Sequence, residues 1–417
     1  MTSSRGASDT PPVRESGFEI FTSRQFPAWL ASQNAALAIS TYETGKLFLV
    51  GLKMNGRLSV VARSFNRAMG LCADGEALWL GTQFQLWRFQ NLLEPGQRSG
   101  EYDRLYVPMT GYTTGDIDIH DIGVKRYALR EDGASEEGVR ENGLSGDGQV
   151  VFVSTLFSCL ATVDSRQSFR PLWRPPYITQ LAPEDRCHLN GLAMKNGKPA
   201  YVTSVSRSDA AAGWRDRRGS GGVVVEVASG EVVIEGLSMP HSPRWHDGEL
   251  YLLDSGSGFF GRADFATRQF EPIAFVPGYL RGLAFAGNYA LVGASKPRKN
   301  RTFTDLLLDE NLKARDVEPR CGVYVIDLAN DSVVHWLNVE GAMGEMYDVA
   351  VLPGTTCPGA LGFSSDEIQR TVKLGPRLWT AGVGAKAQSG HDAQAGPKPQ
   401  TGATAQAGTK PQSGAKE

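Results

Sequence analysis

Three of the six histidines in the 417-residue sequence occupy the same place in a short repeated pattern. His120, His188 and His241 each begin a run that continues with two variable residues, a turn position and an apolar residue. Neutral imidazoles that converge on one point are the commonest ligands of transition metals in proteins. Three histidines with open coordination positions suit catalytic zinc, non-haem iron or copper, which would polarise a carbonyl or activate a bound water. The sequence therefore predicts a three-histidine metal site.

Two other roles for these histidines stay open. They would also contact a carboxylate or phosphate ligand without a metal, together with Arg67 and Arg281, or they would form structural hydrogen bonds only. Asp121 and Asp185 lie close in sequence to two of the histidines. Either carboxylate is a candidate to orient an imidazole ring, as second-layer acceptors do in metal sites.

The pattern occurs six times along the chain, and histidine begins only three of the copies. The first residues of the copies are Arg67, His120, His188, His241, Tyr279 and Met346. Two positions later stand Met69, Ile122, Asn190, Pro243, Arg281 and Asp348. Residues i and i+2 of a strand share a face, so both sets are expected to face one channel. Beside the histidines, the predicted catalytic or binding residues are Arg67, Asn190, Tyr279, Arg281 and Asp348. Arg67, Arg244 and Arg281 lie near the inner strands and are expected to pair with an acid such as Asp348, unless Arg67 or Arg281 clamps a substrate carboxylate.

The repeats predict an all-β propeller of six blades. The turn positions of successive copies are separated by 53, 68, 53, 38 and 67 residues, and one four-stranded blade needs about 40–50 residues. The longer intervals fit loop insertions such as Asp132–Asn142. Strand-like runs such as Ala77–Phe89 and Leu250–Ala263 mix β-branched and aromatic residues between Gly, Asp and Asn. A seven-bladed ring is the main alternative.

The two ends of the chain are expected to close the ring. Three strand-like runs precede the first copy, at Ala35–Tyr42, Lys46–Lys53 and Arg57–Ser64, whereas only Tyr347–Leu352 follows the sixth. Three strands from one end and one from the other make a complete blade and remove free sheet edges.

Two loops are expected at the same end of the ring as the histidines. Trp173–His188 contains two prolines and the run PEDR, which exclude a central strand there. Ser204–Gly221 carries Trp214 among charged residues and is either a lid over the channel mouth or a solvated loop. Cys187 precedes His188 and is expected to face away from the channel, because neighbours in a strand point to opposite faces.

Composition sets the outer limits of the molecule. We expect residues 1–16 to be disordered, 17–375 to form the propeller, and 376–417 to be a disordered low-complexity tail, because its Gly, Ala, Gln, Lys and Pro residues bury little apolar area. The net charge of −2 gives no reason to expect nucleic-acid or membrane binding. No secretory signal is evident, and the five cysteines have no disulfide-framework spacing. These features predict a cytoplasmic monomer.

Several strings resemble a known family. PEDRCHLNGLAM, GLSMPHSPRWHDG, TGDIDIHDIG, YLRGLAF and MYDVAVLP are similar to sequences of a bacterial family of conserved hypothetical proteins with a domain of unknown function. The resemblance covers residues 25–353 and implies a cytosolic propeller, with no established activity. The architecture is more distantly similar to gluconolactonase and senescence-marker propellers, which hold a divalent cation at the channel through carboxylate and amide oxygens. The histidine-rich ring departs from that ligand set.

The functional prediction is a metal-dependent enzyme that acts on a small polar or peptide-like substrate at the channel mouth. His120, His188 and His241 would hold the metal, and Arg67 and Arg281 would orient an anionic group. The alternative is a non-enzymatic propeller that binds a small ligand or a partner protein.

Overall fold

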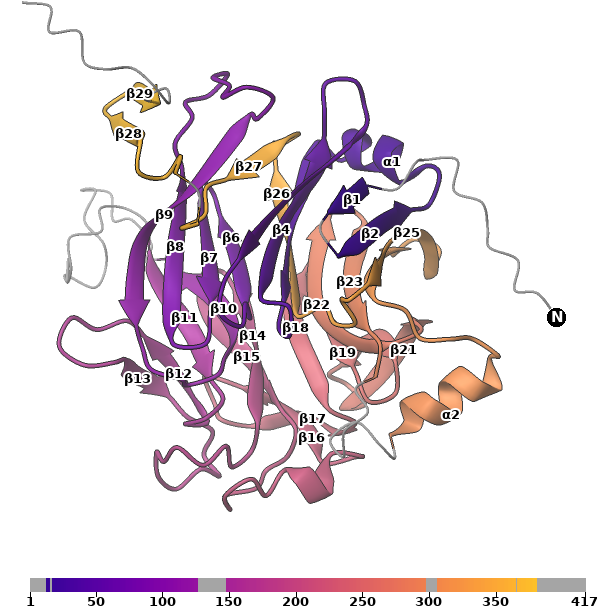
Figure 1. Cartoon of the computed structure of the whole chain (residues 1–417). Coiled ribbons are helices and arrows are strands. Elements are labelled where there is room, and N and C mark those ends of the chain that lie inside the picture. The colour runs from indigo at the N-terminus through magenta and orange to yellow at the C-terminus, as the bar shows by residue number, and fades with distance from the viewer. Residues whose placement is uncertain (1–12, 16, 127–147, 298–305, 365, 381–417) are drawn as a thin grey trace, which may run out of the picture.

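Six blades surround a central channel, and each blade is an antiparallel sheet built on four strands (Figure 1). In this computed structural model the described residues are 13–15, 17–126, 148–297, 306–364 and 366–380. Blade 1 consists, from the channel outward, of β26 (Asp348–Pro353), β3 (Ala35–Thr41), β4 (Lys46–Leu52) and β5 (Leu58–Ser64). Blade 2 consists of β6 (Leu71–Asp74), β7 (Ala77–Gly81), β8 (Gln85–Asn91) and β9 (Arg104–Thr113). Blade 3 consists of β10 (Ile119–Lys125), β11 (Gln149–Ser154), β12 (Cys159–Thr162) and β13 (Arg170–Trp173).

The second half of the chain repeats this order. Blade 4 consists of β14 (Leu189–Lys195), β15 (Lys198–Ser204), β16 (Gly222–Glu226) and β17 (Val232–Leu237). Blade 5 consists of β18 (Pro240–His246), β19 (Glu249–Asp254), β20 (Phe259–Asp264) and β21 (Gln269–Phe275). Blade 6 consists of β22 (Tyr279–Ala286), β23 (Tyr289–Ser295), β24 (Gly322–Asp327) and β25 (Ser332–Gly341). The predicted six-bladed propeller is confirmed.

The ring closes through blade 1, as the sequence predicts. The C-terminal strand β26 pairs antiparallel with β3, with Val351 opposite Leu37, and Figure 1 shows it beside the N-terminal strands of that blade. The innermost strands of neighbouring blades contact one another all the way round. Pairing the two ends of the chain within one sheet leaves no free inner edge at the point of closure.

Apolar side chains fill the spaces between blades. Six clusters of buried residues each join two adjacent blades, and a seventh lies under the loop that carries Trp214. Strands such as β3 and β7 are buried along their whole length, since both of their faces pack against other blades. This double burial explains why their sequences are continuous apolar runs instead of alternating ones.

The structure adds pairings that the sequence analysis missed. β2 (Phe18–Thr22) and β1 (Val13–Glu15) extend blade 6 beyond β25. β27 (Pro358–Ala360) runs parallel to β9. β28 (Thr371–Leu374) and β29 (Arg377–Thr380) form a hairpin that crosses our predicted boundary at residue 375. The proposed insertion at 132–142 lies outside the described residues.

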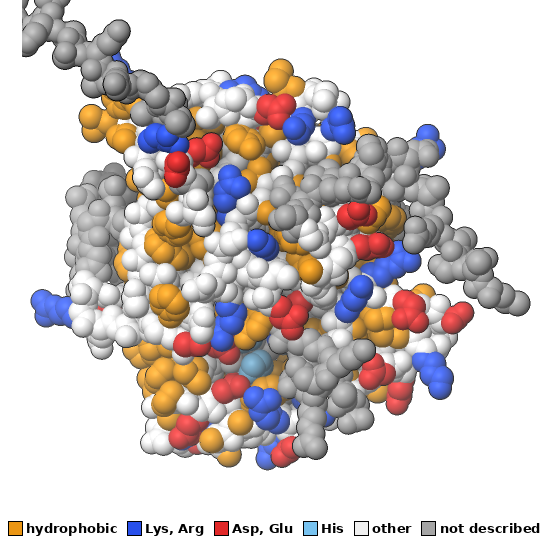
Figure 2. Space-filling model, viewed as in Figure 1, with side chains coloured by type: hydrophobic (Ala, Val, Ile, Leu, Met, Phe, Trp, Pro, Cys, Tyr) orange, Lys and Arg blue, Asp and Glu red, His pale blue; other side chains and the backbone are white. Residues whose placement is uncertain are grey.

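Helices are short and peripheral. α1 (Phe26–Ser32) buries Phe26, Trp29 and Leu30 against blades 1 and 6, and α2 (Leu307–Ala314) buries Leu308 and Leu312. No helix in the described part of the chain has the length and apolarity needed to cross a bilayer. The face in Figure 2 carries Lys and Arg side chains interspersed with Asp and Glu, with apolar groups between them.

The repeated pattern coincides with a local irregularity of the innermost strands. The register of β10 on β11 shifts between Ile119 and Ile122, and that of β18 on β19 shifts between His241 and Arg244. Comparable shifts occur early in β14 and β22. An irregularity of this kind breaks the strict alternation of side chains and re-aims the residues within it. The assumption that i and i+2 face one channel therefore does not hold for every copy: Ile122 packs in the apolar cluster between blades 2 and 3, whereas Asn190 contacts His241.

Candidate functional site

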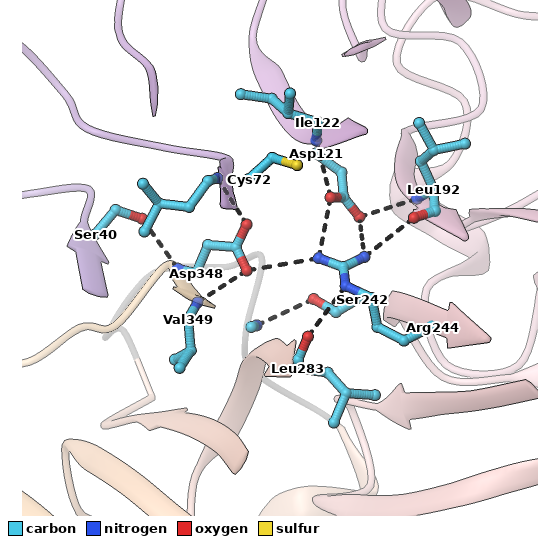
Figure 3. Close-up of polar contacts among 12 residues, drawn as sticks. Ser40, Cys72, Asp121, Ile122, Leu192, Ser242, Arg244, Leu283, Asp348 and Val349 are labelled. Atoms are coloured by element: carbon cyan, nitrogen blue, oxygen red, sulfur yellow. Dashed lines mark hydrogen bonds and ion pairs between the residues drawn. The ribbon is translucent and has the colours of Figure 1, made fainter. Parts of the chain in front are cut away.

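An arginine from blade 5 bridges two carboxylates across the channel (Figure 3). The Arg244 guanidinium donates to both carboxylate oxygens of Asp121, at 2.7 and 3.1 Å, and lies 3.7 Å from Asp348 Oδ1. Its Nε donates to the carbonyl oxygen of Leu283 at 3.0 Å. Both carboxylates are buried, at 2% and 3% exposure. Three alternate blades are thereby tied together at the axis, a cluster that we call the channel plug.

The two acids of the plug are held in the same way. Asp121 accepts from its neighbour Ile122 and from Leu192 of the next blade, each at 2.9 Å. Asp348 accepts from its own neighbour Val349 at 2.9 Å and from the next blade's Leu71 at 2.8 Å. These matched bonds make Asp348 the structural counterpart of Asp121.

This correspondence corrects the sixth copy of the pattern by one residue. If Asp348 matches Asp121, then Tyr347 matches His120 and stands at the level of the histidines. Met346, which we had placed there, is buried in the cluster between blades 1 and 6. Asp121 pairs with Arg244 and contacts no imidazole among the described residues, whereas the pairing expected between Asp348 and one of the channel arginines is present, with Arg244 as the partner.

The three histidines lie together, as the repeat predicts. The ring centres of His120 and His188 are 5.0 Å apart, and those of His120 and His241 are 6.5 Å apart. Tyr279 meets His241 edge-on at 5.7 Å, and Tyr347 lies 5.5 Å from His120. We call these five side chains the histidine cluster. Each is buried, with at most 8% of its surface exposed.

His188 forms a dyad with Asp185. Its Nδ1 lies 3.0 Å from both Asp185 carboxylate oxygens, and the indole of Trp214 donates to Asp185 Oδ2 at 2.7 Å while packing 4.2 Å from the imidazole. The orienting role predicted for Asp185 is present in this geometry. His188 also has φ 53°, a left-handed conformation that residues other than glycine adopt rarely and that tends to occur at functional sites. The Ser204–Gly221 loop is not solvated along its whole length, because Trp214 packs inward on the histidine cluster.

His120 is oriented through its Nδ1 atom as well. Nδ1 lies 2.7 Å from the Thr155 hydroxyl, which donates to the carbonyl of Leu189 and so must accept from the imidazole. The carbonyl oxygen of Asp118 lies 3.3 Å from the same nitrogen. The proton of His120 is therefore on Nδ1, and the Nε2 lone pair is available.

His241 completes the set with one difference. Its Nδ1 lies 2.8 Å from the Met239 carbonyl, which can only accept. Its Nε2 lies 3.3 Å from the Asn190 amide nitrogen, and Thr203 donates to the oxygen of that amide at 2.8 Å. Asn190 thus donates to His241 Nε2. Among the described residues, no partner contacts Nε2 of His120 or His188.

The two arginines predicted as clamps differ in their partners. Arg67 is paired with Asp116 and lies 3.2 Å from Asp118 Oδ1. Arg281 has no carboxylate partner within the described part of the chain, and its guanidinium lies 4.7 Å from the Tyr347 ring centre and 5.7 Å from that of Tyr279. Of the two roles left open, pairing with a carboxylate or clamping a substrate, the geometry favours pairing for Arg67 and not for Arg281.

The histidine cluster fits a bound cation poorly. In the described ranges, no three His, Cys, Asp or Glu side chains have the arrangement needed to hold a metal ion. One of the three Nε2 atoms, that of His241, already accepts from Asn190. Arg281 adds a permanent positive charge near His120 and His241. The predicted zinc, iron or copper site stays a prediction without geometric support from these residues.

The surroundings of Cys187, the cysteine next to His188, disfavour a reactive thiolate. Cys187 packs among apolar residues of blades 3 and 4, away from the histidine cluster. Burial raises the pKa of its thiol to about 12. A nucleophilic cysteine needs a thiolate, which this environment disfavours.

The sequence of this chain matches one described protein family. Residues 24–361 match the model of a family described as "Domain of unknown function (DUF4915)". The chain belongs to this family. The match covers both the histidine cluster and the channel plug, which are therefore features of the family's domain in this chain. No curated protein matches the sequence.

Solved structures similar to this member of the family share only a low level of sequence identity. A chain from a nidogen–laminin complex is 11% identical, with a TM-score of 0.46, and the match spans 77% of this chain and 99% of the nidogen–laminin chain. A protein of unknown function from Bacteroides caccae is 8% identical, with a TM-score of 0.40 and coverage of 76% and 98%. Virginiamycin B lyase from Staphylococcus aureus is 12% identical, with a TM-score of 0.35 and coverage of 66% and 96%.

Two buried imidazoles predict a loss of stability in mild acid. Burial, the largest cause, together with the charges of His188 and Arg281, lowers the pKa of His120 and His241 well below 6.5. As the pH falls through 6.5 the unfolded chain takes up protons that the folded protein does not, so stability present above that pH is lost below it. The slope is about 1.4 kcal/mol per pH unit for each histidine.

Urea unfolding at pH values from about 5 to 8 measures this slope. The double variant His120→Gln, His241→Gln is expected to show a shallower dependence than the wild type. Equal slopes for the two proteins would mean that these imidazoles titrate normally in the folded state.

Proposed function

We propose that the histidine cluster binds a small polar molecule directly and that His188 acts on it as a general base. The supporting observation is the dyad: the Asp185 carboxylate lies 3.0 Å from Nδ1, while no described residue contacts Nε2. A carboxylate on Nδ1 fixes the tautomer whose Nε2 lone pair can take a proton, and it stabilises the imidazolium that results. General-base catalysis of this kind contributes about 10²–10⁴-fold to a rate.

The surrounding residues support recognition of a polar ligand. His120 is neutral with its Nε2 available, so it accepts a hydrogen bond from a ligand hydroxyl or amine. Asn190 and Tyr279, two of the residues predicted from the sequence, act through His241: one donates to its Nε2 and the other packs on its ring. We assign them positioning roles.

The metal-dependent reaction and the peptide-like substrate predicted from the sequence remain alternatives, as does a purely binding role. Metal content of protein purified without an affinity tag tests the first: a full equivalent of zinc, iron or copper would favour it over the metal-free base. The cytoplasmic location and the monomeric state likewise remain predictions.

Thermal stabilisation by a panel of small polar metabolites tests the binding function. We expect at least one compound to raise the melting temperature of the wild type by about 2 °C or more. The shift should disappear in His188→Gln, which loses the Nε2 acceptor in that position. His246→Gln is the matched control, since His246 stacks on Phe285 at 4.1 Å, outside the cluster. Loss of the shift in both variants alike would contradict a specific role for the cluster.

A further inference from the structure

Arg281 is a buried arginine that forms no direct ion pair with a described carboxylate, although the charge of the buried Glu345 acts on it. The arginine is 8% exposed, and its Nε has no hydrogen-bond partner. Arg186, which is 7% exposed, shows the usual solution at comparable depth, because it pairs with Glu184 and Asp209. Arg244, which is partly buried, is likewise paired in the channel plug. A buried charge without a partner is strongly unfavourable, because burial removes its hydration and nothing replaces it.

The neighbours of Arg281 connect it to the histidine cluster. Its guanidinium lies over the ring of Tyr347, which is the neighbour of His120, and beside Tyr279, which is the neighbour of His241. The hydroxyl of Tyr347 is also buried without a hydrogen-bond partner. Two donors without a partner among the described residues, Nε of Arg281 and the Tyr347 hydroxyl, therefore stand near two acceptors that also have none there, Nε2 of His120 and of His188.

These groups define the chemistry of the missing partner. Arginine recognises carboxylate and phosphate oxygens, and a tyrosine hydroxyl donates to the same kind of acceptor. The imidazole Nε2 atoms require the opposite, a hydroxyl or amine that donates. One ligand satisfies all four only if it carries an anionic group and hydrogen-bond donors close to that group.

We propose that Arg281 and Tyr347 form an anion subsite of the histidine cluster and that the ligand is a small hydroxylated carboxylate or phosphate. This inference rests on the proposed function, and it adds the substrate class. The anionic group occupies the Arg281 side, and a hydroxyl of the same molecule reaches His120 and His188. Because the base and the anion are neighbours, the hydroxyl proton that His188 takes up lies close to the group that Arg281 holds.

Replacement of Arg281 by methionine tests the subsite without knowledge of the natural ligand. Methionine has similar length and no charge, so Arg281→Met removes an uncompensated buried cation. In a buffer without carboxylate or phosphate, we expect the variant to melt at or above the wild-type temperature. A variant that melts several degrees lower would show that Arg281 has a structural partner, and it would overturn the proposal.

Three probes that differ only at one carbon test the ligand class: glucose, glucuronate and glucose 6-phosphate, each at tens of millimolar. The wild type should be stabilised by about 2 °C or more by at least one anion and not by glucose. Arg281→Met should lose this shift, and the exposed-arginine control Arg262→Met should keep it. The stronger of the two anions identifies carboxylate or phosphate as the preferred group.

The outcomes separate this inference from the proposed function. If neither anion stabilises the wild type beyond glucose, or if Arg281→Met responds like the wild type, the anion subsite is wrong. If glucose itself stabilises the wild type and His188→Gln abolishes the effect, the proposed function holds while the subsite fails. If an anion stabilises the wild type and His188→Gln alike, but not Arg281→Met, the subsite holds while the direct role of His188 fails.

Discussion

Replacement of Arg244 by methionine is expected to lower the free energy of unfolding by about 3–5 kcal/mol. Arg244 is the only charged partner shown for two buried carboxylates among the described residues, and both of them accept backbone hydrogen bonds from two blades. Its removal leaves Asp121 and Asp348 buried near each other without a compensating cation. The loss reflects this uncompensated charge more than the strength of the original ion pairs.

The effect should depend on pH in a defined direction. Burial raises the pKa of Asp348, and Arg244 opposes this increase by lowering it. Without the arginine the carboxyl will take up a proton at a higher pH, which removes the unpaired charge. We therefore expect Arg244→Met to be less destabilising at mildly acidic pH than at alkaline pH.

Urea unfolding measures the difference, and Arg262→Met is the matched control. Arg262 lies in β20 of the same blade, separated from β18 by β19, and it is exposed and pairs with Glu249 and Glu271 at the surface. Its replacement should change stability by no more than about 1 kcal/mol. Combining Arg244→Met with Asp121→Asn and Asp348→Asn should recover part of the loss. A full loss in the triple variant would mean that the plug acts through packing and not through charge.

The propeller itself was predictable because its signals are local. Apolar runs such as Ala35–Thr41 and turn glycines can be recognised from residues that are close in sequence. The number of blades follows from counting the six copies, and the three-plus-one closure follows from where the runs occur. The strands that escaped prediction lack such signals. β27 is three residues long and pairs in parallel with β9, so no alternation or turn announces it.

The histidine cluster was only partly predictable, for a physical reason. Repeat position brought His120, His188 and His241 together, but the shifts of strand register at the pattern decide which following residues turn inward. Those shifts make Asp121 and Arg244 partners across blades, which no spacing along one strand indicates. The replacement of Met346 by Tyr347 at the level of the histidines has no such shift behind it, since β26 pairs with β3 in continuous register. The adjacent Asp348 was the available signal, since an acid after the ring residue also occurs in His120–Asp121.

Asp185→Asn is expected to reduce turnover of the substrate by about 10²-fold or more, with little change in KM. An asparagine amide can donate to Nδ1 of His188, which would favour the tautomer that carries its proton on Nε2. That imidazole has no lone pair toward the ligand and cannot act as a base. Binding that depends on Arg281 should persist, because the anion subsite is untouched.

Turnover of the ligand identified by thermal stabilisation measures the rate effect, and long-range nitrogen–proton NMR of the imidazole reports the tautomer independently. Asp209→Asn is the matched control. Asp209 accepts from Arg186 and Thr179 in the same group of loops, yet it contacts no histidine. If Asp185→Asn changes the tautomer but leaves turnover at the wild-type level, His188 is not the base. If both variants lose turnover equally, the loops as a whole, and not the dyad, support the reaction.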